Sequence, residues 1–389
     1  MILLEVFSQV PDPRTPCHAL KHLLVDILCI ALCAVLSGGE SFVDMEDYGR
    51  AKDTWLRERL GLELPNGIPT HDTFRRVFGA LCPDAFESCF RRWTQQLHQE
   101  SGGDLLAIDG KAVRHCFDTA SGQGALHLVS VWASEARLVL AQQKVAAKSN
   151  EMTAVPLLLE RLDLQGSVVT SDALNTQKNV AAAIHEGGGD YVLALKPNHL
   201  HLFEDVRDTF AWCQNQSQNQ SQNPCYEQCW QSSEWGHGRH EVRRGFCLST
   251  PLDEWPQAVR AWSGLRCIVM VERERTVLSP EGVPPGAHDQ PTRTRHFFLS
   301  SLGATDPRVE KAIRAHWGIE NSLHWVLDVA FDEDGCRVRK DHAPQNFATL
   351  RKLALNLLRQ DQKAKCGVKA RRKIAGWDED YLLSILAAP

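Results

Sequence analysis

Apolar residues in the first hundred positions recur every three to four residues, which is the spacing of amphipathic helices. The longest apolar run, residues 23–36, predicts a buried helix, because it contains Asp26 and is shorter than the roughly 18 to 20 residues that a membrane span needs. Further helices are expected at residues 41–62, 70–81 and 84–97. We therefore expect residues 1–100 to form an all-helical domain.

The helix expected at residues 70–81 leaves two interpretations open. Thr70 and Asp72 are each able to cap it, and its apolar side leaves Arg75 and Arg76 elsewhere on the surface. Such a helix after a short turn can enter a DNA groove. It can equally belong to a packing module whose arginines face solvent.

After residue 104 the pattern changes to short apolar runs bounded by turn residues. Three neighbouring runs predict antiparallel strands at residues 104–114, 125–134 and 137–146. A helix, a strand, a helix and a strand are then expected at residues 149–164, 167–172, 176–189 and 190–196. This order is that of a mixed α/β core, to which we assign residues 101–200 and, after an interruption, residues 301–360.

The interruption, residues 201–300, predicts a β-rich insertion. Its polar Gln/Asn/Ser tract at residues 214–223 cannot bury a core and is expected to be a flexible loop. Strand patterns at residues 245–250, 265–275 and 295–301 lead back to the core. Asp306 and Pro307 then supply an N-cap and a first-turn proline for the next helix.

Two aspartates follow apolar strand patterns in the same manner, Asp109 after LLAI and Asp172 after SVVTS. If the two strands are neighbours, their carboxylates face each other, and two like charges held close together favour a bound divalent cation. For either residue alone, the alternative is a turn-forming Asp after a strand. The pair, with a third acid available, indicates a metal site.

The third acid, Glu320, is expected on a helix. His316 and His324 lie one turn to either side of it and Asp328 one turn further along, so the four form a polar stripe. Such a stripe beside an apolar face can simply face solvent. Two histidines and two acids flanked by two tryptophans are less typical of a plain surface.

With these segments the chain resembles the DDE transposases of bacterial insertion sequences, in the group that includes the H-repeat-associated proteins. The motifs are IDGK, TSDALNTQ, YVLALKPN and HWGIENSLHWVLDVAFDED. The likeness extends to VPDPR, SFVDMEDYGR and PTHDTFRRVF, so it covers nearly the whole chain. It implies an RNase H-like catalytic fold.

The resemblance also implies an activity. Asp109, Asp172 and Glu320 match the catalytic acids that hold two Mg²⁺ ions in similar enzymes, and Mn²⁺ can substitute. Such ions activate water or a DNA 3′-hydroxyl for in-line attack on a phosphodiester. The implied partners are the inverted-repeat ends of the element and target DNA, on which the protein is expected to assemble as a homodimer or a higher oligomer.

Two departures from related transposases concern phosphate binding. In related transposases a Tyr, an Arg and a Lys often surround the catalytic Glu. At the corresponding positions this chain has Ile313, His316 and Leu327. Pro197 and His199 stand where Gly and Gln are expected. Phosphate contacts are therefore expected from other polar residues.

Ten polar residues are candidates for DNA contact, because they follow the strands, lie in the insertion or surround Glu320. The alternative for each is ordinary solvated surface. The candidates are Lys111, Arg114, Lys148, Lys178, Lys196, Asn198, Arg239, His316, His324 and Arg337.

Composition adds two constraints. The formal net charge of −5 argues mildly against a protein that merely coats DNA. The 13 cysteines are odd in number and form no CxxC pair, and the N-terminus lacks a secretory signal pattern, so we expect reduced thiols in a cytoplasmic, nucleoid-associated protein. Residues 361–389 nevertheless form a basic C-terminal segment, whose basic residues include Lys363, Lys365, Lys369, Arg371, Arg372 and Lys373.

Two alternative functions stay open. The first is a retired transposase that still binds DNA but no longer cuts it. The second is a zinc-dependent hydrolase or a zinc-organised DNA-binding module built on Cys225, Cys229, His237 and His240. A zinc finger usually separates its Cys and His pairs by about twelve residues or more, so a chance cluster is favoured.

Overall fold

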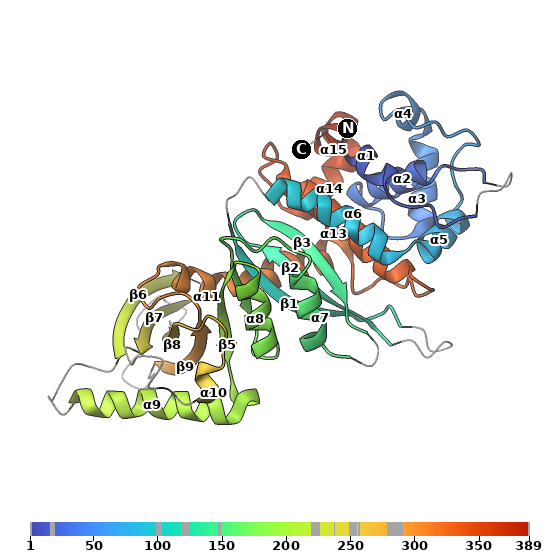
Figure 1. The fold of residues 1–389 in the computed structure, drawn as a ribbon. Coiled ribbons are helices and arrows are strands. Elements are labelled where there is room, and N and C mark those ends of the chain that lie inside the picture. The colour runs from blue at the N-terminus through green and yellow to red at the C-terminus, as the bar shows by residue number, and fades with distance from the viewer. Residues whose placement is uncertain are drawn as a thin grey trace. The chain divides into compact units, whose positions relative to one another are not determined.

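The computed structural model describes residues 2–15, 20–98, 103–117, 124–146, 149–218, 226–236, 238–248, 255, 257–277 and 291–387 (Figure 1). The chain forms two compact units. Unit 1 comprises Met1–Gly102, Asp109–Ala154 and Gly318–Pro389, and unit 2 comprises Gly103–Ile108 and Val155–Trp317. Strand β1 (Leu105–Val113) therefore contributes residues to both units.

The N-terminal part of unit 1 is helical, as expected. The apolar run forms α2 (Leu24–Leu36), which is buried along nearly its whole length. Asp26 is tolerated inside it because its carboxylate accepts a 3.1 Å hydrogen bond from the backbone N–H of Leu64. Within the described part of the chain, no helix combines the length and apolarity needed to cross a membrane. The other helices are α1 (Ile2–Ser8), α3 (Phe42–Ala51), α4 (Asp53–Glu58), α5 (His71–Ala80) and α6 (Pro83–His98).

The C-terminal part of unit 1 packs on these helices (Figure 1). The rings of Phe42 and Phe78 lie 5.8 and 6.4 Å from the ring of Phe347. Asn356 exchanges two 2.8 Å hydrogen bonds with the backbone of Val139 in the sheet. One core thus joins the first hundred residues, the sheet and the C-terminus. The C-terminal elements are the π-helical turn η4 (Glu320–His324), α12 (Trp325–Phe331), α13 (Ala343–Gln360), α14 (Val368–Trp377) and α15 (Glu379–Leu386).

The strands hydrogen-bond in the order β3-β2-β1-β4-β5-β9-β8-β7-β6, as a mixed sheet of nine strands among the described residues. The central strands β1, β4 and β5 run parallel, and β9 pairs antiparallel with β5. The other bounds are β2 (Leu126–Ala133), β3 (Leu138–Lys144), β4 (Val168–Ser171), β5 (Asp190–Leu195), β6 (Tyr226–Gly236), β7 (Arg239–Leu248), β8 (Cys267–Val277) and β9 (Thr292–Ser300).

The remaining helices follow the expected order. Arg308 begins α11 just after the expected Asp306 cap, whose Oδ1 accepts a 2.9 Å hydrogen bond from the backbone N–H of Arg308. The helices are α7 (Glu151–Leu159), α8 (Lys178–Glu186), η2 (Pro197–His199), α9 (Leu200–Gln218), α10 (Gln257–Arg260) and α11 (Arg308–Ile319). The expected mixed α/β core with a β-rich insertion and an N-terminal helical region is confirmed.

Three details of the expectations were wrong. The first part of the polar tract, residues 214–218, is not a loop but the end of α9. Strand β6 was not expected; it forms the edge of the nine-stranded sheet, next to β7. Cys213 is disulfide-bonded, although reduced thiols were expected; Cys29, Cys33, Cys82, Cys89, Cys116, Cys229, Cys247, Cys267, Cys336 and Cys366 are free.

Candidate active site

The strands that precede the two aspartates are neighbours, as their proposed role requires. Ile108 of β1 and Ser171 of β4 are partners in the parallel register. Asp109 and Asp172 directly follow this pair in the sequence. The side chain of Asp109 is 26% exposed, so it is neither buried in the core nor free in solvent.

Asp109 lies in unit 1 beside a turn of unusual geometry. Residues Glu320–His324 form a π-helical turn between α11 and α12, a feature often found at functional sites. Nδ1 of His324 lies 3.4 Å from Oδ2 of Asp109 and 3.3 Å from Oε2 of Glu320. One ligand atom from each residue lies within 4.8 Å of the other two, so the three can hold one metal ion together.

His324 differs from its two neighbours in exposure. Its side chain is 5% exposed, whereas that of Glu320 is 58% exposed. Burial, together with the positive charges of Lys111 and Lys352, lowers the pKa of His324 to about 4. The imidazole is therefore neutral near pH 7, which is the form that ligates metals.

Lys111, expected to contact DNA, is held by acids of the same unit. Its ammonium binds Asp328 at short range, Oε2 of Glu333 at 3.2 Å and Oδ1 of Asp334 at 3.9 Å. Glu333 is buried, which alone would raise its pKa, but the charges of Lys352 and Lys111 lower it. The contact of Lys111 with DNA stays a prediction, and in this structure the side chain anchors α12 and the following turn to β1.

Asp172 lies in unit 2 at the start of a tight loop. Its Oδ1 accepts hydrogen bonds from the backbone and side-chain nitrogens of Asn175, both at 3.2 Å. Asn198 donates to the carbonyl of Ala173 in the same loop. The alternative interpretation of Asp172 as a turn-forming residue is therefore compatible with its local contacts.

His316 lies in the same unit. Its Nδ1 is 3.3 Å from Oγ1 of Thr170 on β4, the strand that ends just before Asp172. Burial lowers the pKa of His316, although the charge of Asp172 acts in the opposite direction. Asp172 is therefore close enough to His316 for its charge to act on the imidazole.

The other DNA-contact candidates differ in their surroundings. Arg114 pairs with Asp334 at 3.3 Å and Arg239 with Glu241 at 3.9 Å. Lys148 lies outside the described residues. Arg114 is 79% exposed despite its pairing with Asp334, and the other exposed candidates are Lys178, Lys196, Asn198 and Arg337.

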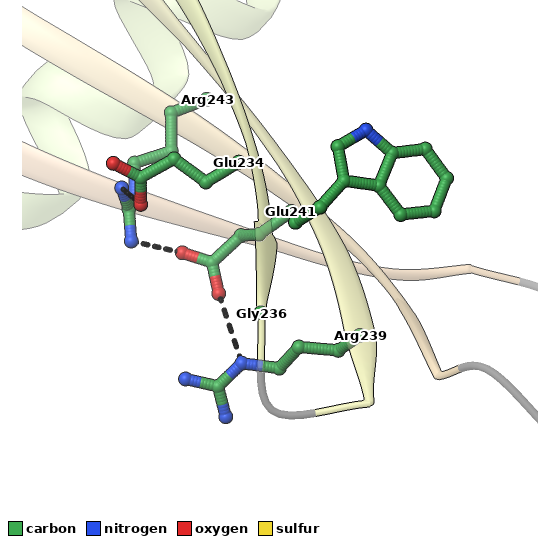
Figure 2. A pocket seen from close by; sticks show the side chains of 6 residues that line it. Glu234, Gly236, Arg239, Glu241 and Arg243 are labelled. Carbon is green, nitrogen blue, oxygen red and sulfur yellow. Dashed lines mark hydrogen bonds and ion pairs between the residues drawn. The ribbon is translucent and has the colours of Figure 1, made fainter. Parts of the chain in front are cut away.

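A shallow pocket of about 400 Å³ lies on the β6–β7 hairpin and is lined by Arg239, Glu234, Glu241 and Arg243 among others. Figure 2 shows Glu241 between the two arginine side chains, with Glu234 beside Arg243. Each guanidinium thus already has a carboxylate partner. The pocket is therefore not an open anion site.

The possible zinc cluster cannot be assembled from the described residues. Cys225 and His237 lie outside them. His240 stacks on Trp235 with ring centroids 4.0 Å apart, and Cys229 lies on β6. Among the described residues, the one group of three or more His, Cys, Asp or Glu side chains that can hold a metal is Asp109, Glu320 and His324.

Glu151 was missed in the sequence analysis. Its carboxylate packs against Gly110, the residue after Asp109, and Oε1 pairs with Nε2 of His127 at 2.8 Å. The absent side chain of Gly110 therefore makes room for a buried acid of the protein itself. Glu151 begins α7, where acids are common, so its position alone gives no signal of this contact.

Replacing Gly110 by Ala should destabilise the protein by about 1 to 3 kcal/mol. An added Cβ would overlap the carboxylate of Glu151 and force it away from His127. Because Glu151 is buried, its carboxylate would lose this partner without gaining full solvation. Thermal unfolding can compare this variant with Gly303→Ala, where an added Cβ meets nothing within 4 Å. Equal unfolding temperatures would contradict the described packing.

The fold and the site define a mixed α/β protein with carboxylates after paired parallel strands and a candidate metal centre of two acids and an imidazole. A family model described as "Transposase DDE domain" matches residues 100–357, and one described as "DDE_Tnp_1-associated" matches residues 4–94. The chain belongs to the DDE transposase family.

Two relatives are similar to this chain over most of its length. The "H repeat-associated putative transposase YhhI" of Escherichia coli (strain K12) is 35% identical, over 99% of this chain and 97% of its own length. An "Uncharacterized protein in dhlA 3'region" of Xanthobacter autotrophicus is 44% identical, over 69% of this chain and 87% of its own length. The match to a cryo-EM structure of the piggyBac transposase synaptic complex with hairpin DNA covers 100% of this chain and 82% of that chain, with a TM-score of 0.41 and 11% identity.

Proposed function

We propose that this protein is a Mg²⁺-dependent DNA transposase that cleaves and joins strands at the inverted-repeat ends of its own element. The observation that carries the proposal is the cluster of Asp109, Glu320 and His324 in a chain of the DDE family. Carboxylates placed this close repel each other, and a divalent cation relieves the repulsion.

The proposed catalytic residues are Asp109, Asp172 and Glu320. Asp109 and Glu320 belong to the described cluster, and family membership adds Asp172 as the third carboxylate. When bound, the metal supplies an activated oxygen nucleophile and stabilises the leaving oxygen. The side chain of Glu320 is 58% exposed, so a substrate can reach the cluster from the side of this carboxylate. The side chain of His324 is 5% exposed, so it lies on the buried side of the cluster.

DNA is the proposed partner. The exposed cations Lys178, Lys196 and Arg337 are the candidates that we favour for phosphate contacts, because Lys111, Arg114 and Arg239 are already paired with carboxylates. Assembly on paired DNA ends as a homodimer or a higher oligomer is part of the same proposal.

Removing divalent metal should abolish cleavage. The experiment incubates the full chain with a labelled duplex that carries the end of its element, with Mg²⁺, with Mn²⁺ or with chelator. We expect nicked or joined products with either metal, none with chelator, and recovery when excess Mg²⁺ is added back.

A gel-shift assay on the same duplex provides the control. Binding with no cleavage under any metal would indicate the retired form of the enzyme. Cleavage that continues in chelator would contradict the metal-dependent mechanism.

A further inference from the structure

The spacing of the three donor atoms in the cluster carries information about its ligand. The separations of 3.3 and 3.4 Å between Nδ1 of His324 and the two carboxylate oxygens exceed the usual hydrogen-bond length of about 2.9 Å. Ligands about 2.1 Å from one metal ion lie roughly 3.0 to 3.4 Å apart in octahedral or tetrahedral geometry. The spacing of Nδ1 from each carboxylate oxygen is thus that of two ligands of one ion, and one ligand atom from each of the three residues lies within 4.8 Å of the other two.

The imidazole adds a second, independent observation. The side chain of His324 is 95% buried, since it is 5% exposed, and its Nδ1 faces both acids. Within the described residues its Nε2 has no hydrogen-bond partner. In the neutral ring with its proton on Nε2, the lone pair of Nδ1 is therefore directed toward the two acids and is available to a cation held between them.

We propose that His324 is itself a metal ligand and that its nitrogen makes this centre prefer Mn²⁺ or Co²⁺ over Mg²⁺. The proposal rests on the proposed function, and it reassigns His324 from DNA contact to metal binding. Carboxylates alone suit Mg²⁺, whereas an imidazole nitrogen raises the affinity for transition metals. The π-helical turn places this nitrogen beside Glu320 and toward Asp109.

Pulsed electron paramagnetic resonance on Mn²⁺ bound to the tag-free full chain tests the assignment directly. A ligated imidazole gives a ¹⁴N coupling to Mn²⁺, which carboxylates do not give. We expect this coupling in the native protein, with Mn²⁺ bound at least about tenfold more tightly than Mg²⁺. Mn²⁺ bound without ¹⁴N coupling, or equal affinities for the two ions, would overturn the proposal.

Variants assign the coupling to one residue. His324→Asn should remove the coupling and lower Mn²⁺ affinity about tenfold, with little change for Mg²⁺. His342→Asn, at an exposed histidine outside the cluster, should leave the coupling unchanged. If His324→Asn fails to fold by circular dichroism, Asp109→Asn provides the assignment, because losing the facing carboxylate should weaken the coupled Mn²⁺ signal. A coupling that persists in the folded His324→Asn variant, or undiminished in Asp109→Asn, would contradict the assignment.

The outcomes separate this proposal from the proposed function. Cleavage with Mg²⁺ in a protein that shows no ¹⁴N coupling would leave the transposase proposal standing and remove His324 from the metal shell. Absence of cleavage under every metal would contradict the enzymatic proposal, whatever the Mn²⁺ spectrum shows.

Discussion

Asp109→Asn should reduce metal-dependent cleavage of the element's DNA ends by about 100-fold or more, with the fold retained. The carboxylate is one of the two acids in the described cluster, and its replacement removes a negative charge from the metal site. Metal stabilisation of the transition state contributes several kcal/mol, and about 1.4 kcal/mol changes a rate tenfold. A loss of about 3 kcal/mol therefore gives the expected factor.

A charge-matched control variant tests whether the loss of cleavage is specific to the metal site. Asp47→Asn removes the same charge from an exposed position of α3. It should cleave at the native rate, and both variants should show native circular dichroism and native binding to the end duplex. Equal cleavage by Asp109→Asn and the native chain would refute the assigned role of this acid.

The part of the site that follows from strand patterns could be predicted from the sequence. Apolar runs followed by Asp109 and Asp172 indicated two strand ends, and β1 and β4 are indeed neighbours. The inward position of His324 could not be predicted, because regular helical spacing treats it as one member of a polar stripe. The π-helical turn changes that spacing, and no residue pattern specifies the turn.

Contacts between segments that are distant in the sequence could not be predicted either. Lys111 looks like a surface cation in the sequence, but Asp328 and Glu333, its partners, are more than 200 residues away. Helix α9, by contrast, did leave a signal in the sequence. Its buried residues recur at helical spacing up to the start of the polar tract at residue 214, and they are Leu202, Val206, Phe210 and Cys213.

The C-terminal segment shows how composition can mislead. Its basic residues suggest a surface patch, yet Arg372 is buried. Its guanidinium donates hydrogen bonds to the carbonyls of Val35 at 2.9 Å, Gly39 at 3.1 Å and Ala330. Burial lowers the pKa of Arg372 to about 10, so it remains charged at neutral pH. The residue thus ties α14 to the end of α2 and to α12.

Arg372→Met should destabilise unit 1 by about 3 to 5 kcal/mol. Methionine fills much of the same volume, but it removes the guanidinium donor from three carbonyl oxygens, and each oxygen left without a donor costs about 1 kcal/mol or more. It also removes the guanidinium that lies 4.4 Å from the ring centre of Phe331. Urea unfolding followed by circular dichroism measures the loss. Lys373→Met, at the next, exposed position of α14, should change the unfolding free energy by less than about 0.5 kcal/mol. Similar midpoints for the two variants would mean that the buried guanidinium does not hold the three segments together.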